Sequence, residues 1–69
     1  MSKTATPRKV IPLILRQGFV LSRQRGSHAI YVLPSDQSMV IVPMHAKEIS
    51  KGTLNRILKI IGLTIRDLK

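Results

Sequence analysis

His28 is the residue of this sequence best suited to proton transfer, because it follows a candidate tight turn, Gly26-Ser27, and lies close to Arg23 and Arg25. Histidine has an ordinary pKa of about 6.5, so its imidazole accepts and donates protons near neutral pH. The two guanidinium groups are suited to hold a phosphate beside it. This combination predicts chemistry on a phosphodiester.

RNA supplies the rest of such a reaction through its own 2′-hydroxyl. A base removes the hydroxyl proton, the oxygen attacks the adjacent phosphorus, and cations stabilise the charge that develops. These steps require no metal ion. The alternative for His28 is structural, since a polar residue at a strand end beside a turn is often simply solvated.

Three other residues carry weaker signals. Formation of the turn is sufficient to explain both Gly26 and Ser27. The functional alternative for Gly26 is close approach of a phosphate to its backbone, and for Ser27 it is nucleophilic attack. No Ser-His-acid arrangement accompanies Ser27, which favours its turn role. His45, in the segment VPMH, becomes a second proton-transfer group if the chain there folds toward His28.

Lysine and tyrosine side chains offer further contacts for RNA. Lys47 and Lys51 flank the expected N-terminus of a helix, where backbone N–H groups and lysines together favour an anion. Tyr31 is expected to pack in the core, with base stacking as its functional alternative. Arg56 and Lys59 are expected on a solvated helix face, where they attract polyanions without specificity. With two histidines and no cysteine, neither a metal site nor a cofactor is expected.

The composition favours a polyanion as the partner. Twelve Lys and Arg residues against three Asp and Glu give the 69 residues a formal net charge of +9, which attracts nucleic acid. A structural protein bound to ribosomal RNA also fits this charge, although the sequence has no basic tail or low-complexity arm. Apolar runs are far shorter than the roughly 20 residues that span a bilayer. The N-terminus MSKTATPRK lacks an apolar signal core, so we expect a cytoplasmic location.

The elements that must position these residues begin with a helix over 7–17. Thr6 is suited to be its N-cap, Pro7 suits the first helical position, and Gly18 marks its end. Pro12 removes a backbone donor inside this helix, which predicts a kink or a late start.

Three strands are predicted next, over 19–25, 28–33 and 39–42. Gly26-Ser27 is typical of a type II′ hairpin turn between the first two, and the segment PSDQS is typical of a turn before the third. The third strand is apolar on both faces. A two-residue hairpin loop implies three pairs on one face of the sheet: Arg25 with His28, Arg23 with Ile30, and Leu21 with Val32.

A second helix is expected after Ser50 as N-cap, with Ile49 packing onto its first turns. Gly62 stops this helix, and Thr64 is suited to cap a last short turn. Four apolar residues recur at helical spacing as its buried stripe: Leu54, Ile57, Leu58 and Ile61. The order predicts one α+β domain over 1–69, α-β-β-β-α, with both helices on one face of a three-stranded antiparallel sheet.

Two stretches, GFVLSRQRGSHAIYVLP and MVIVPMHAKEISKGTLNRILKIIGL, cover most of the chain and carry a family resemblance. Their distinctive parts are Gly18-Phe19 after the first helix, Gly26-Ser27-His28 before an aromatic at Tyr31, Val42-Pro43-x-His45, and Lys51-Gly52-Thr53-Leu54 entering the last helix. In order and spacing these parts resemble the HicA family of toxin ribonucleases.

The resemblance implies a small domain similar to the double-stranded RNA-binding fold. It implies an mRNA interferase of a type II toxin–antitoxin system, which cuts RNA without the ribosome and is silenced by a HicB-type antitoxin. It maps the catalytic histidine onto His28 and matches His45 to a second histidine position without assigning it a role. Pro12 departs from the family's polar residue in that helix. The competing interpretation is a noncatalytic module of the same fold, which binds RNA and does not cut it.

Overall fold

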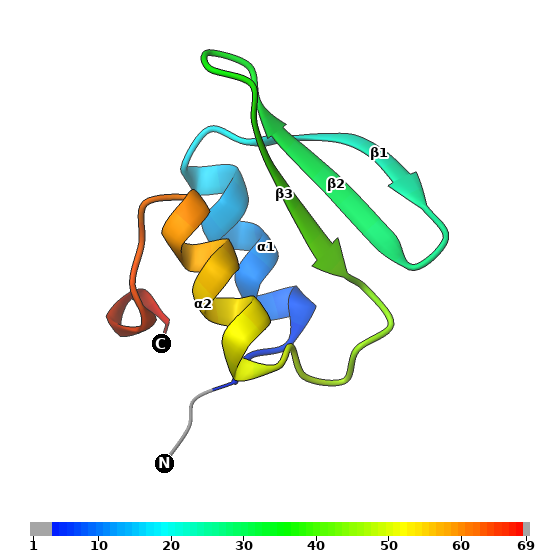
Figure 1. Ribbon diagram of the computed structural model, residues 1–69, viewed down its shortest axis with the longest axis vertical. Coiled ribbons are helices and arrows are strands. Elements are labelled where there is room, and N and C mark those ends of the chain that lie inside the picture. Colours follow the sequence, from blue (N-terminus) through cyan, green and yellow to red (C-terminus); the bar gives the residue numbers. More distant parts are fainter. Residues whose placement is uncertain (1–3, 69) are drawn as a thin grey trace.

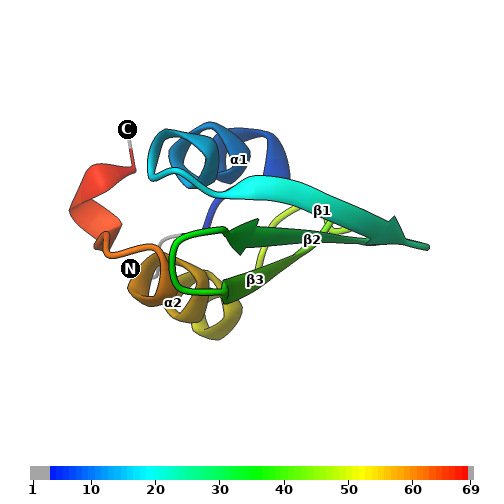
Figure 2. The ribbon, with the colours of Figure 1, turned by 90° about the horizontal axis from the view of Figure 1, so that it is seen from above.

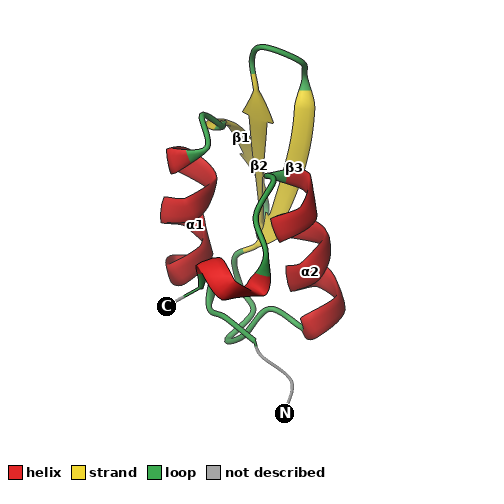
Figure 3. Ribbon diagram, turned by 90° about the vertical axis from the view of Figure 1, so that its left-hand side faces the viewer, coloured by secondary structure: helices red, strands yellow, loops and turns green. Residues whose placement is uncertain are grey.

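The computed structural model describes residues 4–68, so residues 1–3 and 69 of the predicted domain lie outside it. Its strands form one antiparallel sheet in the order β1-β2-β3. Both helices cover the same face of this sheet (Figures 1 and 3), which confirms the predicted α+β arrangement. The elements are α1 Pro7–Arg16, β1 Val20–Arg25, β2 His28–Leu33, β3 Ser38–Pro43, α2 Lys51–Ile60 and a 3₁₀ helix, Ile65–Asp67.

The helix α1 begins where Thr6 caps it. The Thr6 hydroxyl accepts a hydrogen bond from the backbone N–H of Lys9 at 3.3 Å, and Pro7 occupies the first turn. The helix then continues through Pro12, so the predicted late start is wrong. Because Pro12 has no backbone N–H, the carbonyl of Arg8 loses its hydrogen-bond partner within the helix. Both residues are exposed, so water can bind that carbonyl.

Gly18 ends α1 in a conformation that disfavours any side chain. Its φ is +96°, and a Cβ added there would lie 3.2 Å from Cδ1 of Leu33. We expect Gly18→Ala to lower the free energy of unfolding by about 1–2 kcal/mol, the cost of left-handed backbone for a residue with a Cβ. Urea unfolding measures this change.

Gly52→Ala is the matched control for that experiment. Gly52 lies inside α2, and an added Cβ there would meet nothing within 4 Å. Alanine favours a helix over glycine by up to about 1 kcal/mol, so this variant should equal or exceed the native protein in stability. A Gly18→Ala protein as stable as the native one would contradict the structural account of this helix end.

One hydrophobic core lies between the helices and the sheet face that they cover. The predicted stripe of α2 is confirmed, since each of its four residues is at most 3% exposed. Side chains from alternate positions of β2 and β3 meet this stripe, as expected for a sheet with one buried face. The principal members are Val10 and Ile14 from α1, Ala29 and Tyr31 from β2, Val40 and Val42 from β3, and Leu54, Ile57, Leu58 and Ile61 around α2.

The β1–β2 hairpin has the predicted turn, with φ of +57° at Gly26 and no positive φ at Ser27, as type II′ requires. Two of the predicted pairs are present: Arg25 with His28, and Arg23 with Ile30. The third is wrong, because Leu21 lies opposite Tyr31. The register shifts between Leu21 and Arg23, where a bulge inserts one extra residue into β1.

The connector from β3 to α2 is held by two backbone hydrogen bonds. Met44 donates its N–H to the carbonyl of Ser27 at 2.6 Å, and Ile49 donates to the carbonyl of Ala5 at 2.7 Å. Ser50 has the extended conformation of an N-cap but makes no side-chain capping bond, since its hydroxyl bonds that of Thr53 at 3.1 Å. The predicted side-chain cap at α2 is therefore absent.

The C-terminal segment turns back over the helices. Gly62 follows α2 with φ of +80°, and Thr64 caps the 3₁₀ helix by accepting from the N–H of Arg66, as predicted. In Figure 2 this helix lies at the opposite end of the molecule from the β1–β2 turn. Among the described residues, no helix has the length and apolar character that crossing a membrane requires.

Candidate nucleic-acid interface

His28 is exposed at the first position of β2, on the sheet face that the helices leave uncovered. Its neighbour along the strand, Ala29, is 1% exposed and faces the core, and successive side chains of a strand project to opposite faces. The sequence places a turn directly before His28, so the strand begins there and the imidazole stands at the end of the sheet.

Arg25 and Arg23 lie on the same face as His28. Residues directly opposite each other in an antiparallel pair project to one face, and Arg25 is the partner of His28 in β1. Arg23 lies two residues before Arg25 in β1 and is the partner of Ile30. Both arginines are exposed. The structure therefore brings together the histidine and the two cations that the sequence analysis singled out.

His28 also lines a groove of about 350 Å³ between β3 and α2. In Figure 2, α2 lies beside β3 while α1 lies beside β1. Arg56 is the one Lys or Arg among the described residues that line this groove. The lining consists of His28, then Met39, Val40, Ile41 and Pro43 of β3, and Thr53, Arg56, Ile57 and Ile60 of α2.

The position of Arg56 in this groove was not predicted from the sequence, which indicated a solvated helix face and no specific role. The sequence of α2 nevertheless contains a pattern that indicates this position. Thr53, Arg56 and Ile60 recur at spacings of three and four, which places them on one side of a helix. Ile60 is apolar, lies outside the buried stripe and is 39% exposed. An apolar residue in that position indicates a second, accessible face of α2.

His45 lies in the connector and is exposed. The bond from Met44 to Ser27 holds the connector beside the hairpin turn, and His45 is the next residue along the chain. The connector therefore passes beside the hairpin turn, and a role for His45 in proton transfer stays a prediction.

The remaining predicted residues lie in different surroundings. Lys51 is the exposed first residue of α2, and Lys47 borders another hollow, beside Pro7 and Arg8. Neither lysine lines the groove that His28 lines. Tyr31 is 6% exposed and faces the core. Its predicted packing is confirmed, and its alternative role in base stacking is wrong because the ring is buried.

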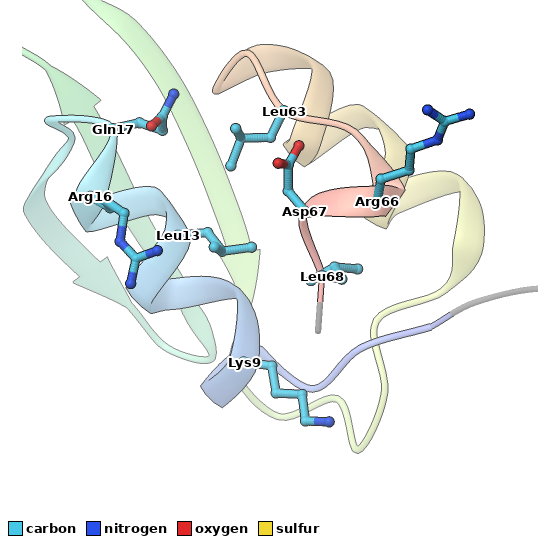
Figure 4. Close-up of a pocket in the computed structure, with 8 residues that line it drawn as sticks. All are labelled: Lys9, Leu13, Arg16, Gln17, Leu63, Arg66, Asp67 and Leu68. Carbon is cyan, nitrogen blue, oxygen red and sulfur yellow. The ribbon is translucent and has the colours of Figure 1, made fainter.

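A second hollow, of about 500 Å³, lies on the helix side of the molecule, between α1 and the C-terminal segment (Figure 4). The side chains of Leu13 and Leu63 point into the space between the two segments. Leu68 and three cations, Lys9, Arg16 and Arg66, also line the hollow. Asp67 also lines it, but its carboxylate accepts the backbone N–H of Thr64 at 2.8 Å. Positive charge is thus present on both sides of the domain.

The fold and this surface define a class of protein, a small basic α+β domain with a histidine and two arginines exposed on the open face of its sheet. Residues 7–63 match the family model described as the HicA toxin of bacterial toxin–antitoxin systems. The chain belongs to the HicA toxin family, and membership implies an antitoxin as its partner. A comparison with curated proteins finds no match.

Proposed function

We propose that this HicA toxin is an endoribonuclease that cleaves mRNA with His28 as its general base. The observation that carries the proposal is the shared face of His28 and Arg25, which are direct cross-strand partners. Opposite residues of this kind have Cβ atoms about 5 Å apart. A phosphate held by the guanidinium of Arg25 therefore lies within reach of the imidazole.

The proposed reaction is attack by the RNA's own 2′-hydroxyl. The neutral imidazole of His28 accepts the hydroxyl proton while the 2′-oxygen forms a bond to the adjacent phosphorus. The bond from phosphorus to the 5′-oxygen of the next nucleotide breaks, and that oxygen takes up a proton. The products are a 2′,3′-cyclic phosphate and a 5′-hydroxyl. Arg25 and Arg23 stabilise the negative charge on the phosphorus-bound oxygens.

The leaving oxygen needs a proton donor, and water is the alternative to a side chain of the toxin. We assign His45 to this step because the Met44–Ser27 hydrogen bond keeps its segment beside the hairpin turn. At the turn, a Cβ added to Gly26 would meet nothing within 4 Å, so RNA can approach the backbone of Gly26 and Ser27 closely. Lys47 and Lys51 would contact phosphates further along the bound strand.

In the cell, this activity would remove mRNA and so inhibit translation and growth. The net charge of +9 draws the toxin to RNA without sequence preference, and His28 then cleaves it. We place the reaction in the cytoplasm, where mRNA is translated, and we infer that a HicB-type antitoxin silences the toxin by covering its basic surface.

Cleavage of a labelled single-stranded RNA in excess EDTA tests this function. Because a histidine base and arginine cations supply the chemistry, we expect EDTA to leave the rate unchanged. We also expect every new 3′ end to carry a cyclic phosphate at early times. Cleavage that EDTA abolishes and Mg²⁺ restores would contradict the proposed mechanism. A folded, antitoxin-free toxin that binds RNA without cutting it would instead support the noncatalytic module.

A further inference from the structure

The two edges of the sheet differ in how they are protected against pairing with another strand. β1 carries a bulge and two arginines, features that natural proteins use to prevent edge-to-edge association. β3, at the other edge, has the sequence SMVIVP, with Pro43 at its last position but no charged residue, and its register with β2 is regular. An apolar edge strand without charge or bulge is suited to pair with a further strand.

One hydrogen bond fixes which backbone groups of β3 point toward its free edge. Met44 donates its backbone N–H to the carbonyl of Ser27, so Ser27 and Met44 form a hydrogen-bonded pair of the ladder. The next pair, His28 with Pro43, therefore exchanges no backbone hydrogen bonds. Bonded and non-bonded pairs alternate along an antiparallel ladder. Ile41 and Met39 therefore direct their N–H and C=O groups away from β2.

The groove between β3 and α2 borders this edge. Three accessible apolar side chains surround it: Met39 is 52% exposed, Ile41 45% and Ile60 39%. Arg56 adds one positive charge on the α2 side. The edge thus offers unpaired backbone groups, apolar contacts and a single cation in one place.

We propose that an extended segment of the antitoxin pairs with β3 as a fourth strand of the sheet. This identification of the occupant rests on the proposed function, in which an antitoxin silences the toxin. Strand addition uses backbone hydrogen bonds for affinity and alternate side chains for specificity. The segment would place apolar side chains against Ile41 and Ile60 and a carboxylate against Arg56. An acidic segment also complements a toxin with a net charge of +9.

A fourth strand would also restrict the approach of RNA to His28. Neighbouring strands lie about 4.8 Å apart, so the added strand would run about 10 Å from β2, separated from His28 by Pro43. Its side chain opposite Pro43 projects to the same face as the imidazole. Pairing with the β3 edge would therefore both position the antitoxin and let it cover His28, the proposed general base.

Amide hydrogen exchange in the toxin–antitoxin complex tests this pairing. The experiment uses the His28→Ala toxin, chosen because the proposed function predicts that it does not cleave host RNA, and a purified HicB-type antitoxin that binds it. We expect the amides of Met39 and Ile41 to exchange at least a hundredfold more slowly in the saturated complex. The amide of Gln24 faces outward on the β1 edge and should not change. Unchanged exchange at Met39 and Ile41 in the saturated complex would overturn the proposal.

A pair of charge variants tests the same surface by affinity. Ile41→Lys adds a cation on the proposed interface and should raise the antitoxin Kd at least a hundredfold. Leu15→Lys adds the same charge at a 50% exposed leucine of α1 and should leave the Kd unchanged within about twofold. Equal Kd values for the two folded variants would overturn the proposal, as would protection of Ile41 in the free toxin through pairing with a second copy.

Neither measurement depends on RNA cleavage. If cleavage is absent while Met39 and Ile41 become protected, the nuclease proposal fails and the strand pairing stands. If cleavage occurs while these amides stay unprotected, the strand pairing fails and the nuclease proposal stands.

Discussion

Replacing His28 with alanine is expected to lower the rate of RNA cleavage by about a hundred- to ten-thousandfold, the usual contribution of general acid–base catalysis. RNA binding should be unchanged, because the arginines and lysines that attract phosphate remain. The fold should also remain, since His28 is exposed and contributes nothing to the core. Single-turnover cleavage and an RNA-binding titration of the same preparation measure the two effects separately.

The matched control for this experiment is His28→Gln, which keeps a polar side chain of similar reach but has no basic nitrogen. It should be as defective in cleavage as His28→Ala. In cells, either variant should permit growth in the absence of antitoxin. A folded His28→Ala protein that cleaves RNA within a few-fold of the native rate would contradict the assignment of His28 as the general base.

Arg25→Ala is expected to have the second-largest effect on cleavage. One donor aimed at the developing charge typically contributes about a hundred- to a thousandfold in rate, and because Arg25 is exposed we expect about a hundredfold. Loss of a phosphate contact should also reduce the salt dependence of RNA binding by about 0.7 in the logarithmic slope for single strands. Cleavage rates and Kd values across a series of salt concentrations provide both numbers.

Arg66→Ala is the matched control, because it removes the same charge from the other side of the domain. Arg66 lines the hollow between α1 and the C-terminal segment, away from the open face of the sheet (Figures 2 and 4). It should change the rate of cleavage by no more than a few-fold. If both variants lose activity equally, the arginines act through net charge, and the proposed contact of Arg25 with the reacting phosphate is refuted.

The sequence predicted the fold well because its signals were local and consistent with one another. Thr6 and Gly18 marked the ends of α1, and the stripe beginning at Leu54 marked the buried side of α2. The glycine of Gly26-Ser27 fixed the turn, and the turn fixed the first pairs of the hairpin. These pairs are the ones that bring Arg25 opposite His28, so the central part of the candidate site was predictable from the turn alone.

The features that sequence reasoning missed depend on tertiary structure. A bulge follows Leu21, and alternation of side chains says nothing about where a strand gains an unpaired residue. Pro12 is tolerated because its side of α1 faces solvent. Arg56 lines the groove with His28 only because α2 packs beside β3, an arrangement that helical periodicity does not determine.

The proposed reaction is tested most directly by removing its nucleophile, the 2′-hydroxyl, from the RNA. Once a cleavage site is mapped, the same RNA is prepared with a 2′-deoxy nucleotide on the 5′ side of the scissile phosphate and offered to the native toxin under single-turnover conditions. We expect unchanged binding and no cleavage at that position, because His28 has no hydroxyl proton to remove. Cleavage at the modified position would contradict the proposed reaction and would show that the toxin uses another nucleophile.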